Sequence, residues 1–159
     1  KGRTKGMALP LLLSTVSQIS AIATVVPPAA LQLAKIFLPG ALTIILLKSK
    51  MVPDVVTAGA QTIAFRIPNH PVALALINGV GMPIIGTSAN LSRRPAGLTA
   101  AEVTAQIGEK VDMIVDGGKC PGGVESTIID LTGDIPVVRR QGAISLDKIR
   151  QVLPETITA

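Results

Sequence analysis

The sequence predicts a mixed α/β fold, a sheet of parallel and antiparallel strands flanked by helices, in a single domain over residues 1–159. Apolar runs of strand length alternate along the chain with segments whose apolar residues recur at helical spacing. Some neighbouring strands are separated only by short turns, as in hairpins, and there is no internal repeat. With 159 residues, 48% of them hydrophobic, the chain can bury a core without disulfides or metal ions.

The first elements are short. Residues 9–13 form an apolar run of strand length, and Pro10 indicates an edge strand or a strand start. Residues 16–25 predict a brief helix. Residues 28–37 predict a better-defined helix, because a proline stands at its start, apolar residues follow at helical spacing, and Pro39-Gly40 ends it.

Two strands are expected next. Residues 41–47 are almost continuously apolar and include β-branched side chains, as in a strand that is covered on both faces. Residues 53–59 are expected to form a loop, and residues 62–67 the second strand. Thr62 and Arg66 are an even number of residues apart, so both side chains should lie on the same face of the sheet.

The middle of the chain carries the first candidate site. Residues 72–78 predict a buried helix that ends at glycine, and residues 82–88 predict a strand. This strand runs into Thr87, Ser88 and Asn90, and small polar residues at the carboxyl edge of an α/β sheet are typical of a ligand site. The same residue types also dominate ordinary Asx and Ser turns, so both interpretations stay open at this point.

The second half of the chain continues the alternation of predicted strands and helices. Thr99 and Glu102 form a capping box that opens a helix ending at Gly108. The glycine-rich stretch 117–123 fits neither the P-loop nor the dinucleotide fingerprint and is interpreted as a flexible loop. The remaining predictions are strands over 111–115, 128–131 and 135–138, a basic corner at 139–142, and a last helix capped by Ser145 with Asp147 in its first turn.

Charge is distributed unevenly. Residues 1–101 hold nine basic residues and one acidic residue, a net charge of +8, whereas residues 102–159 have a net charge of −3. The first part therefore favours an anionic partner, either nucleotide phosphates or a nucleic-acid backbone, although a charge that serves only solubility gives the same pattern. Stacking on nucleic-acid bases is nearly excluded, because the only aromatic residues, Phe37 and Phe65, lie in apolar segments.

The cysteine and histidine counts argue against disulfides, zinc binding and thiol catalysis. Cys120 and His70 are the only residues of their kinds, so we expect no intrachain disulfide, no zinc site and no thiol catalysis, and a cytoplasmic location. The basic start followed by apolar residues 7–13 is similar to a secretory leader. However, Pro10 and the polar residues 14–18 interrupt it, so we expect a cut end instead, and no membrane span.

Several stretches together match one family in order and spacing. They are Lys1-Gly2-Arg3, residues 62–66 with Pro68-Asn69-His70-Pro71, Ser88-Ala89-Asn90-Leu91-Ser92, Asp116-Gly117-Gly118, Val124-Glu125-Ser126-Thr127 and Arg140-Gln141-Gly142. Over almost its whole length the chain resembles the YrdC-type threonylcarbamoyl-AMP synthases. The resemblance implies a twisted mixed sheet flanked by helices, with a positively charged concave surface.

The resemblance also implies an activity. Enzymes of this kind join L-threonine and bicarbonate to the AMP part of ATP and release pyrophosphate, and the product is used for threonylcarbamoyl modification of tRNA adenosine 37. The implied partners are ATP, L-threonine and bicarbonate, together with tRNA or double-stranded RNA and a downstream threonylcarbamoyl transferase. Mg²⁺ is expected to be held mainly by the phosphates and water, with no metal ligands from the protein.

The implied site residues are taken over position by position. The catalytic group is Lys1, Arg3, Ser88 and Asn90; the ATP-binding group is Arg3, Thr62, Ser88 and Arg140; the threonine-binding group is Arg66 and Ser126. The chemistry needs these residue types, because cations neutralise the phosphates while an arginine fork suits a carboxylate.

The chain also departs from the family pattern. The strand, turn and helix that precede the K-x-R pair in the family are missing, so we expect an amino-terminally incomplete domain. Ala96, Ser14 and Arg93 stand where members often have Ser, His and Gly. Two alternatives remain: a non-catalytic module that binds double-stranded RNA or tRNA with the same basic surface, and a domain of a carbamoyl-transferring protein of the hydrogenase-maturation type.

Overall fold

The computed structural model describes residues 8–120 and 124–159. Lys1 and Arg3, the basic pair of the expected catalytic group, lie outside the described residues. The chain divides into two compact units. We call residues 8–86 with 124–159 the sheet unit and residues 87–120 the loop-helix unit, and each is described by itself.

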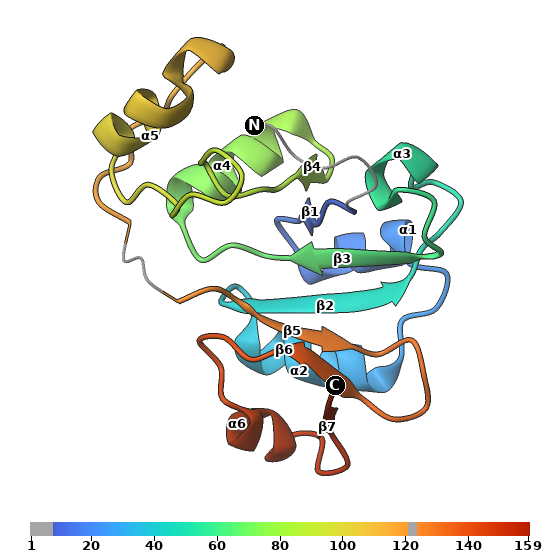
Figure 1. Ribbon diagram of the computed structural model, residues 1–159. Helices are drawn as coiled ribbons and strands as arrows, with labels where there is room; N and C mark the ends of the chain where they lie inside the picture. Colours follow the sequence, from blue (N-terminus) through green and yellow to red (C-terminus); the bar gives the residue numbers. More distant parts are fainter. Residues whose placement is uncertain (1–7, 121–123) are drawn as a thin grey trace. The chain divides into compact units, whose positions relative to one another are not determined.

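The sheet unit is built on seven strands in the order β4-β1-β3-β2-β5-β6-β7, which run from top to bottom in Figure 1. Their bounds are β1 Leu11–Leu12, β2 Leu42–Leu47, β3 Thr62–Arg66, β4 Ile84–Ile85, β5 Thr127–Asp130, β6 Val137–Arg140 and β7 Ile157–Thr158. The pairs β1·β3, β2·β5 and β6·β7 are parallel, and β1·β4, β2·β3 and β5·β6 are antiparallel. The mixed sheet predicted from the sequence is confirmed.

The two faces of this sheet differ in burial. On one face, Leu42, Ile44 and Leu46 of β2 and Ile63 and Phe65 of β3 are at most 1% exposed. Helices α1 (Ile19–Ile22) and α2 (Pro28–Phe37) lie behind the strands in Figure 1, and their buried side chains join the same core. We call this the covered face and the opposite one the open face.

The register and the alternation along β3 assign residues to the open face. Thr62, Ala64 and Arg66 are half-buried, whereas Ile63 and Phe65 between them are buried. The prediction that Thr62 and Arg66 share a face is confirmed. Residues opposite one another in a ladder lie on the same face, so Leu47 of β2, the partner of Thr62, lies there too and is 43% exposed.

Shorter helices complete the chain. The sheet unit also contains η1 (Val16–Gln18), α3 (Asp54–Thr57), α4 (Pro71–Val80) and α6 (Leu146–Arg150), and the loop-helix unit contains α5 (Ala100–Ile107) and η2 (Gly108–Lys110). No helix within residues 8–120 and 124–159 has the length and apolar character to cross a membrane.

Some boundaries predicted from the sequence were wrong. The predicted strand over 111–115 is absent, and Val111, Met113 and Val115 are 40%, 78% and 51% exposed, so the apolar run has no sheet to join. The predicted loop 53–59 contains α3, because Pro53 and Asp54 start a helical turn. The predicted strand over 82–88 is reduced to Ile84–Ile85.

Candidate functional site

Four predicted site residues belong to the sheet unit, and three of them lie in one row across the open face. The register places Ile44 opposite Phe65, so Thr43 of β2 stands opposite Arg66 of β3. Ile128 of β5 stands opposite Arg140 of β6, and Ser126 directly precedes β5. A row of polar residues therefore crosses the sheet where β3, β2, β5 and β6 lie side by side in Figure 1. In strand order these residues are Arg66, Thr43, Ser126 and Arg140.

Arg66 is a half-buried cation. Its Nε donates a hydrogen bond of 2.7 Å to the Gly40 carbonyl oxygen, and burial lowers the pKa of its guanidinium from the ordinary value. The ion pairs within the described residues are Lys48–Asp54, Arg139–Asp130 and Arg140–Glu125, and none of them includes Arg66. A partly desolvated guanidinium without a carboxylate from these residues is suited to an anionic ligand.

Gly40 brings that carbonyl group close to the arginine. A Cβ built on Gly40 would lie 2.3 Å from the carbonyl oxygen of Phe37, so any larger residue would displace the end of α2. Gly40 N in turn donates to Ile67 O at 2.9 Å. In the sequence, Pro39-Gly40 is recognisable only as a helix end. The second role of Gly40, which is to offer its carbonyl oxygen to Arg66, depends on the fold.

Ser126 is held by side chains from two strands. Its hydroxyl lies 2.8 Å from the Thr43 hydroxyl, and both residues are buried, at 8% and 6% exposure. Arg140 donates to the Ser126 carbonyl oxygen from Nε at 3.2 Å and from Nη2 at 2.9 Å. Arg140 Nη2 also lies 3.3 Å from Ser126 Oγ, and Arg140 Nη1 pairs with Glu125.

The two motifs around Ser126 and Arg140 pack directly against each other. A Cβ on Gly142 would lie 2.2 Å from the Glu125 carbonyl oxygen, so only glycine fits there. The buried Thr127 hydroxyl donates to Ile144 O at 2.6 Å and accepts from Gly142 N and Ile144 N, both at 3.0 Å. Thr127 thus ties the segment after β6 to the start of β5 and fixes the backbone on which Ser126 stands.

Thr62, the fourth residue, lies on the same face but farther along the strand. It is four residues from Arg66 on β3, which corresponds to about 13 Å at the usual rise of a strand. Its ladder partner is Leu47, at the other end of β2 from Thr43. The open face therefore carries a row that runs across the strands from Arg66 to Arg140, with Thr62 toward the other end of β3.

Ser88 and Asn90 are in direct contact within the loop-helix unit. The Ser88 hydroxyl donates to Asn90 Oδ1 at 2.6 Å, and Asn90 Nδ2 donates to the Arg94 carbonyl oxygen. Asn90 is buried while Ser88 is exposed. The structure thus brings the predicted pair into direct contact in a hydrogen-bonded turn and leaves the Ser88 side chain at the surface.

Helix α5 supports this turn. Gln106 Oε1 accepts from Leu91 N at 3.2 Å, and Gln106 Nε2 donates to Pro95 O at 3.1 Å. At the start of α5, Thr99 Oγ1 accepts from Glu102 N at 3.2 Å, which confirms the predicted N-cap. Glu102 accepts from Leu98 N at 2.7 Å, one residue before the Thr99 N that a full capping box would use. Gln106 had no signal in the sequence that set it apart from other helix-surface residues.

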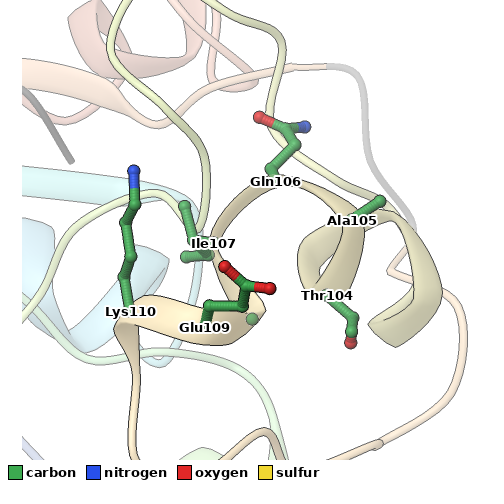
Figure 2. A pocket seen from close by; sticks show the side chains of 7 residues that line it. Thr104, Ala105, Gln106, Ile107, Glu109 and Lys110 are labelled. Carbon is green, nitrogen blue, oxygen red and sulfur yellow. The ribbon is translucent and has the colours of Figure 1, made fainter.

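A hollow of about 430 Å³ lies at the carboxyl end of α5. Its lining runs from Thr104 to Lys110, and Figure 2 shows Glu109 and Lys110 on the short η2 segment beside Ile107 at the end of α5. None of the lining residues is one of the predicted site residues. Gln106, which bonds to the Ser88–Asn90 loop, is among the lining residues.

Two residues that depart from the family pattern have local explanations. Arg93 has a φ of 70°, a left-handed conformation that favours glycine, the residue usual at this position in the resembling family. Ser14 donates to Gln18 Oε1 from its backbone N at 2.8 Å and from its hydroxyl at 3.2 Å. For Ala96, nothing in the structure explains the departure.

The donor set has few groups that suit a metal. Within residues 8–120 and 124–159, no three His, Cys, Asp or Glu side chains are close enough to share an ion. The carboxylate of Glu125, the residue before Ser126, pairs with Arg140. Hydroxyl and guanidinium groups of this kind fit anions and do not form a protein cage for Mg²⁺.

Comparison with known proteins shows which family the chain resembles. The profile of the Sua5/YciO/YrdC family, described as "Telomere recombination", matches residues 1–142. The threonylcarbamoyl-AMP synthase of Pyrococcus abyssi is 41% identical over 155 residues, covering 98% of this chain and 46% of that protein. The Bacillus subtilis threonylcarbamoyl-AMP synthase is 42% identical over 154 residues, covering 96% of this chain and 44% of that protein.

The structural comparison agrees. The crystal structure of P. abyssi Sua5 complexed with L-threonine matches with a TM-score of 0.95 at 40% identity, covering 100% of this chain and 47% of that one. The chain spans about half the length of the curated relatives it matches. The fold predicted from the sequence and the resemblance to the YrdC type are both confirmed, and the chain belongs to the Sua5/YciO/YrdC family.

Proposed function

We propose that this chain carries the catalytic domain of an L-threonylcarbamoyladenylate synthase, a nucleotidyltransferase. Its substrates are L-threonine, bicarbonate and ATP, and its products are threonylcarbamoyl-AMP and pyrophosphate. The observation that carries the proposal is the half-buried Arg66, which has no ion pair within the described residues and lies on the open face beside the Thr43–Ser126 hydroxyl pair. A cation and a hydroxyl on the same face of a sheet suit the carboxylate of a small amino acid.

The names of the relatives support the same assignment. Two relatives at 41% and 42% identity are threonylcarbamoyl-AMP synthases, and P. abyssi Sua5 was crystallised with L-threonine. We assign threonine binding to Arg66 and Ser126, and nucleotide binding to Arg3, Thr62, Ser88 and Arg140. Lys1, Arg3, Ser88 and Asn90 are assigned to the catalytic group.

The chemistry needs cations more than a protein base. The threonine amine and bicarbonate condense to a carbamate with loss of water, and a carbamate oxygen then attacks the α-phosphorus of ATP. The bond from that phosphorus to the bridging oxygen breaks, and pyrophosphate leaves. Two anions must approach each other, so Lys1, Arg3 and Arg140 would neutralise phosphate charge in the transition state.

We propose that Mg²⁺ binds together with ATP. When bound, it supplies charge neutralisation on the leaving pyrophosphate. The donor set described above gives no protein cage for it, so we assign its ligands to phosphate oxygens and water. ATP and tRNA would place the reaction in the cytoplasm, with a threonylcarbamoyl transferase acting next on the product.

Pyrophosphate release tests the proposal. We expect release only when ATP, L-threonine and bicarbonate are all present, and no release when any one of them is omitted. Lys1→Ala or Arg3→Ala should abolish turnover, whereas Lys5→Ala, which removes a neighbouring charge outside the assigned group, should leave it intact. Release from ATP alone, or release that ignores threonine, would contradict the proposal.

RNA binding without catalysis is the second candidate function. It is favoured by the net charge of +8 on residues 1–101. Binding of double-stranded RNA or tRNA through phosphates should weaken steeply with salt and ignore sequence. An RNA affinity that stays constant between 50 mM and 200 mM salt, within about a factor of two, would exclude this candidate, because each phosphate contact releases counterions.

A further inference from the structure

The buried contact between Thr43 and Ser126 carries an inference about how the proposed amino-acid site works. Thr43 was not singled out by the sequence, where it is one polar residue inside the apolar strand β2. In the structure its hydroxyl lies 2.8 Å from Ser126 Oγ, and the residue is only 6% exposed. Thr43 also stands opposite Arg66 in the β2·β3 register, so it lies between the two residues assigned to threonine.

The direction of this hydrogen bond follows from counting donors and acceptors. A hydroxyl group has one proton to donate and two lone pairs to accept with. If Ser126 donated to Thr43, the buried Thr43 proton would have no acceptor among the side-chain hydrogen bonds of the described residues. A buried donor without a partner costs free energy, so the arrangement in which Thr43 donates to Ser126 is favoured.

The same count decides what Ser126 can offer a ligand. Arg140 Nη2 lies 3.3 Å from Ser126 Oγ and can only donate. With Thr43 as the second donor, both lone pairs of Ser126 are occupied. The Ser126 proton is then the group that remains for an acceptor on a ligand, and two incoming donors make it a stronger donor.

We propose that Thr43 is a positioning residue that holds the Ser126 hydroxyl as a hydrogen-bond donor toward an acceptor oxygen of the bound amino acid. The inference rests on the proposed function, because it takes threonine as the ligand of Arg66 and Ser126. Thr43 itself does not contact the ligand; it acts through Ser126. The ligand group that suits this donor, together with the Arg66 cation, is a carboxylate.

Two substitutions of Thr43 separate positioning from packing. Thr43→Val keeps the shape of the side chain and removes the hydroxyl, and Thr43→Ser keeps the hydroxyl and removes a methyl group. Thr57→Val is a matched control, because Thr57 is 1% exposed and its hydroxyl bonds only to Asp54 O of its own helix, at 3.4 Å. All three variants are compared with the wild-type full chain.

The readouts are L-threonine affinity by calorimetric titration and the KM values for threonine and ATP from pyrophosphate release. We expect Thr43→Val to weaken threonine binding about tenfold, the effect of one buried hydrogen bond, with the KM for ATP unchanged. Thr43→Ser should restore the affinity, and Thr57→Val should leave it at the wild-type value. A purely structural role would instead move thermal stability in both valine variants and leave the ratio of the two KM values unchanged.

The possible results separate the positioning role of Thr43 from the proposed function on which it rests. If the wild type binds threonine and Thr43→Val binds it equally well, the positioning role is overturned while the proposed function stands. If Thr43→Ser fails to restore what Thr43→Val loses, although both fold, the hydroxyl is not the active group and the inference is again overturned. If the wild type binds no threonine, both the proposed function and the inference are overturned.

Discussion

Arg66 is the side chain on which the proposed threonine site depends most. Its Nε is used by the Gly40 carbonyl group, which fixes the plane of the guanidinium and leaves its two terminal nitrogens for other partners. Burial disfavours the charged form and lowers the pKa of the guanidinium, but an arginine side chain stays charged at physiological pH. The cost of this desolvation is recovered when an anion binds.

Replacing Arg66 by lysine tests the importance of the planar fork. Arg66→Lys keeps the charge but cannot make paired hydrogen bonds with a carboxylate, so we expect threonine affinity to fall by about tenfold or more. Calorimetric titration with L-threonine measures the change. Arg150→Lys is the matched control, because Arg150 Nε also donates to a backbone carbonyl, that of Thr156, at 2.9 Å on α6. Equal losses in both variants would show that the Arg66 fork has no special role.

Arg93 adopts a conformation that costs free energy for a residue with a Cβ. Its φ of 70° lies in the left-handed region, where glycine is unhindered. We expect Arg93→Gly to raise the free energy of unfolding by about 0.5–1 kcal/mol, the relief of strain less the added chain entropy. Chemical denaturation measures it, and Arg94→Gly, with the same charge change at an adjacent residue of negative φ, should not stabilise. Stabilisation by Arg94→Gly as well would point to charge instead of conformation.

Among the elements, the antiparallel pair β5·β6 and the segments at its ends hold Ser126 and Arg140, two residues of the proposed site. Thr127 and Gly142 fasten the two segments, and Arg140 adds its bonds to the Ser126 carbonyl oxygen. The segment after β6 has to pass within contact distance of the Glu125 and Ser126 backbone, which is why it carries a glycine. The two motifs, Val124-Glu125-Ser126-Thr127 and Arg140-Gln141-Gly142, therefore pack as one assembly.

Adding a methyl group to Gly142 should disrupt the packing of these two motifs and destabilise the protein. In Gly142→Ala the new Cβ would meet the Glu125 carbonyl oxygen at 2.2 Å and backbone atoms of Ser126, so the strands must move apart. We expect a loss of about 1–3 kcal/mol in the free energy of unfolding, as for other overpacked sites, and a weaker response to threonine. Gly133→Ala is the control, since nothing lies within 4 Å of a Cβ there. Urea unfolding that shows equal effects would contradict the packing argument.

Asp130 links the stability of the same strand pair to pH. Burial alone would raise the pKa of Asp130, but hydrogen bonds from the side chain and backbone of Thr132, and the hydrogen bond and charge of Arg139, lower it below its ordinary value. A carboxyl group with a lowered pKa in the folded state stabilises the protein above its unfolded pKa, about 3.9, and this stabilisation is lost as pH falls through the folded value.

Asp130→Asn should therefore be less stable than the wild type at pH 7, and the difference should shrink as the pH is lowered from about 4 toward 2. Urea unfolding of both proteins across this range measures the difference. Asp134→Asn, which removes an exposed carboxylate from the neighbouring turn, controls for the change of net charge. A difference that grows toward low pH would have the wrong sign and would refute the explanation.

At the scale of the whole chain, the sequence predicted what depends on local pattern. The alternation in β3 correctly placed Thr62 and Arg66 on one face, and Thr99 with Glu102 correctly predicted the start of α5. Resemblance supplied Ser126 and Arg140, which the structure brings into contact. These features follow from residues that are close in sequence or belong to one motif.

Features that depend on distant packing could not be predicted. Thr43 is 83 residues from Ser126 in the chain, and only the parallel pairing of β2 with β5 brings the two together. The apolar residues 111–115 resemble a strand in composition, yet they have no strand to pair with in the described structure. Propensity sets a preference, and the available neighbours decide whether it is realised.

A crystal structure of the full chain grown with L-threonine tests the central claim most directly. That claim is that the open face of the sheet holds an amino-acid carboxylate between Arg66 and Ser126. We expect the carboxylate within hydrogen-bonding distance, about 2.7–3.2 Å, of both the Arg66 guanidinium and the Ser126 hydroxyl. Threonine bound elsewhere, or bound with its carboxylate away from Arg66, would contradict it.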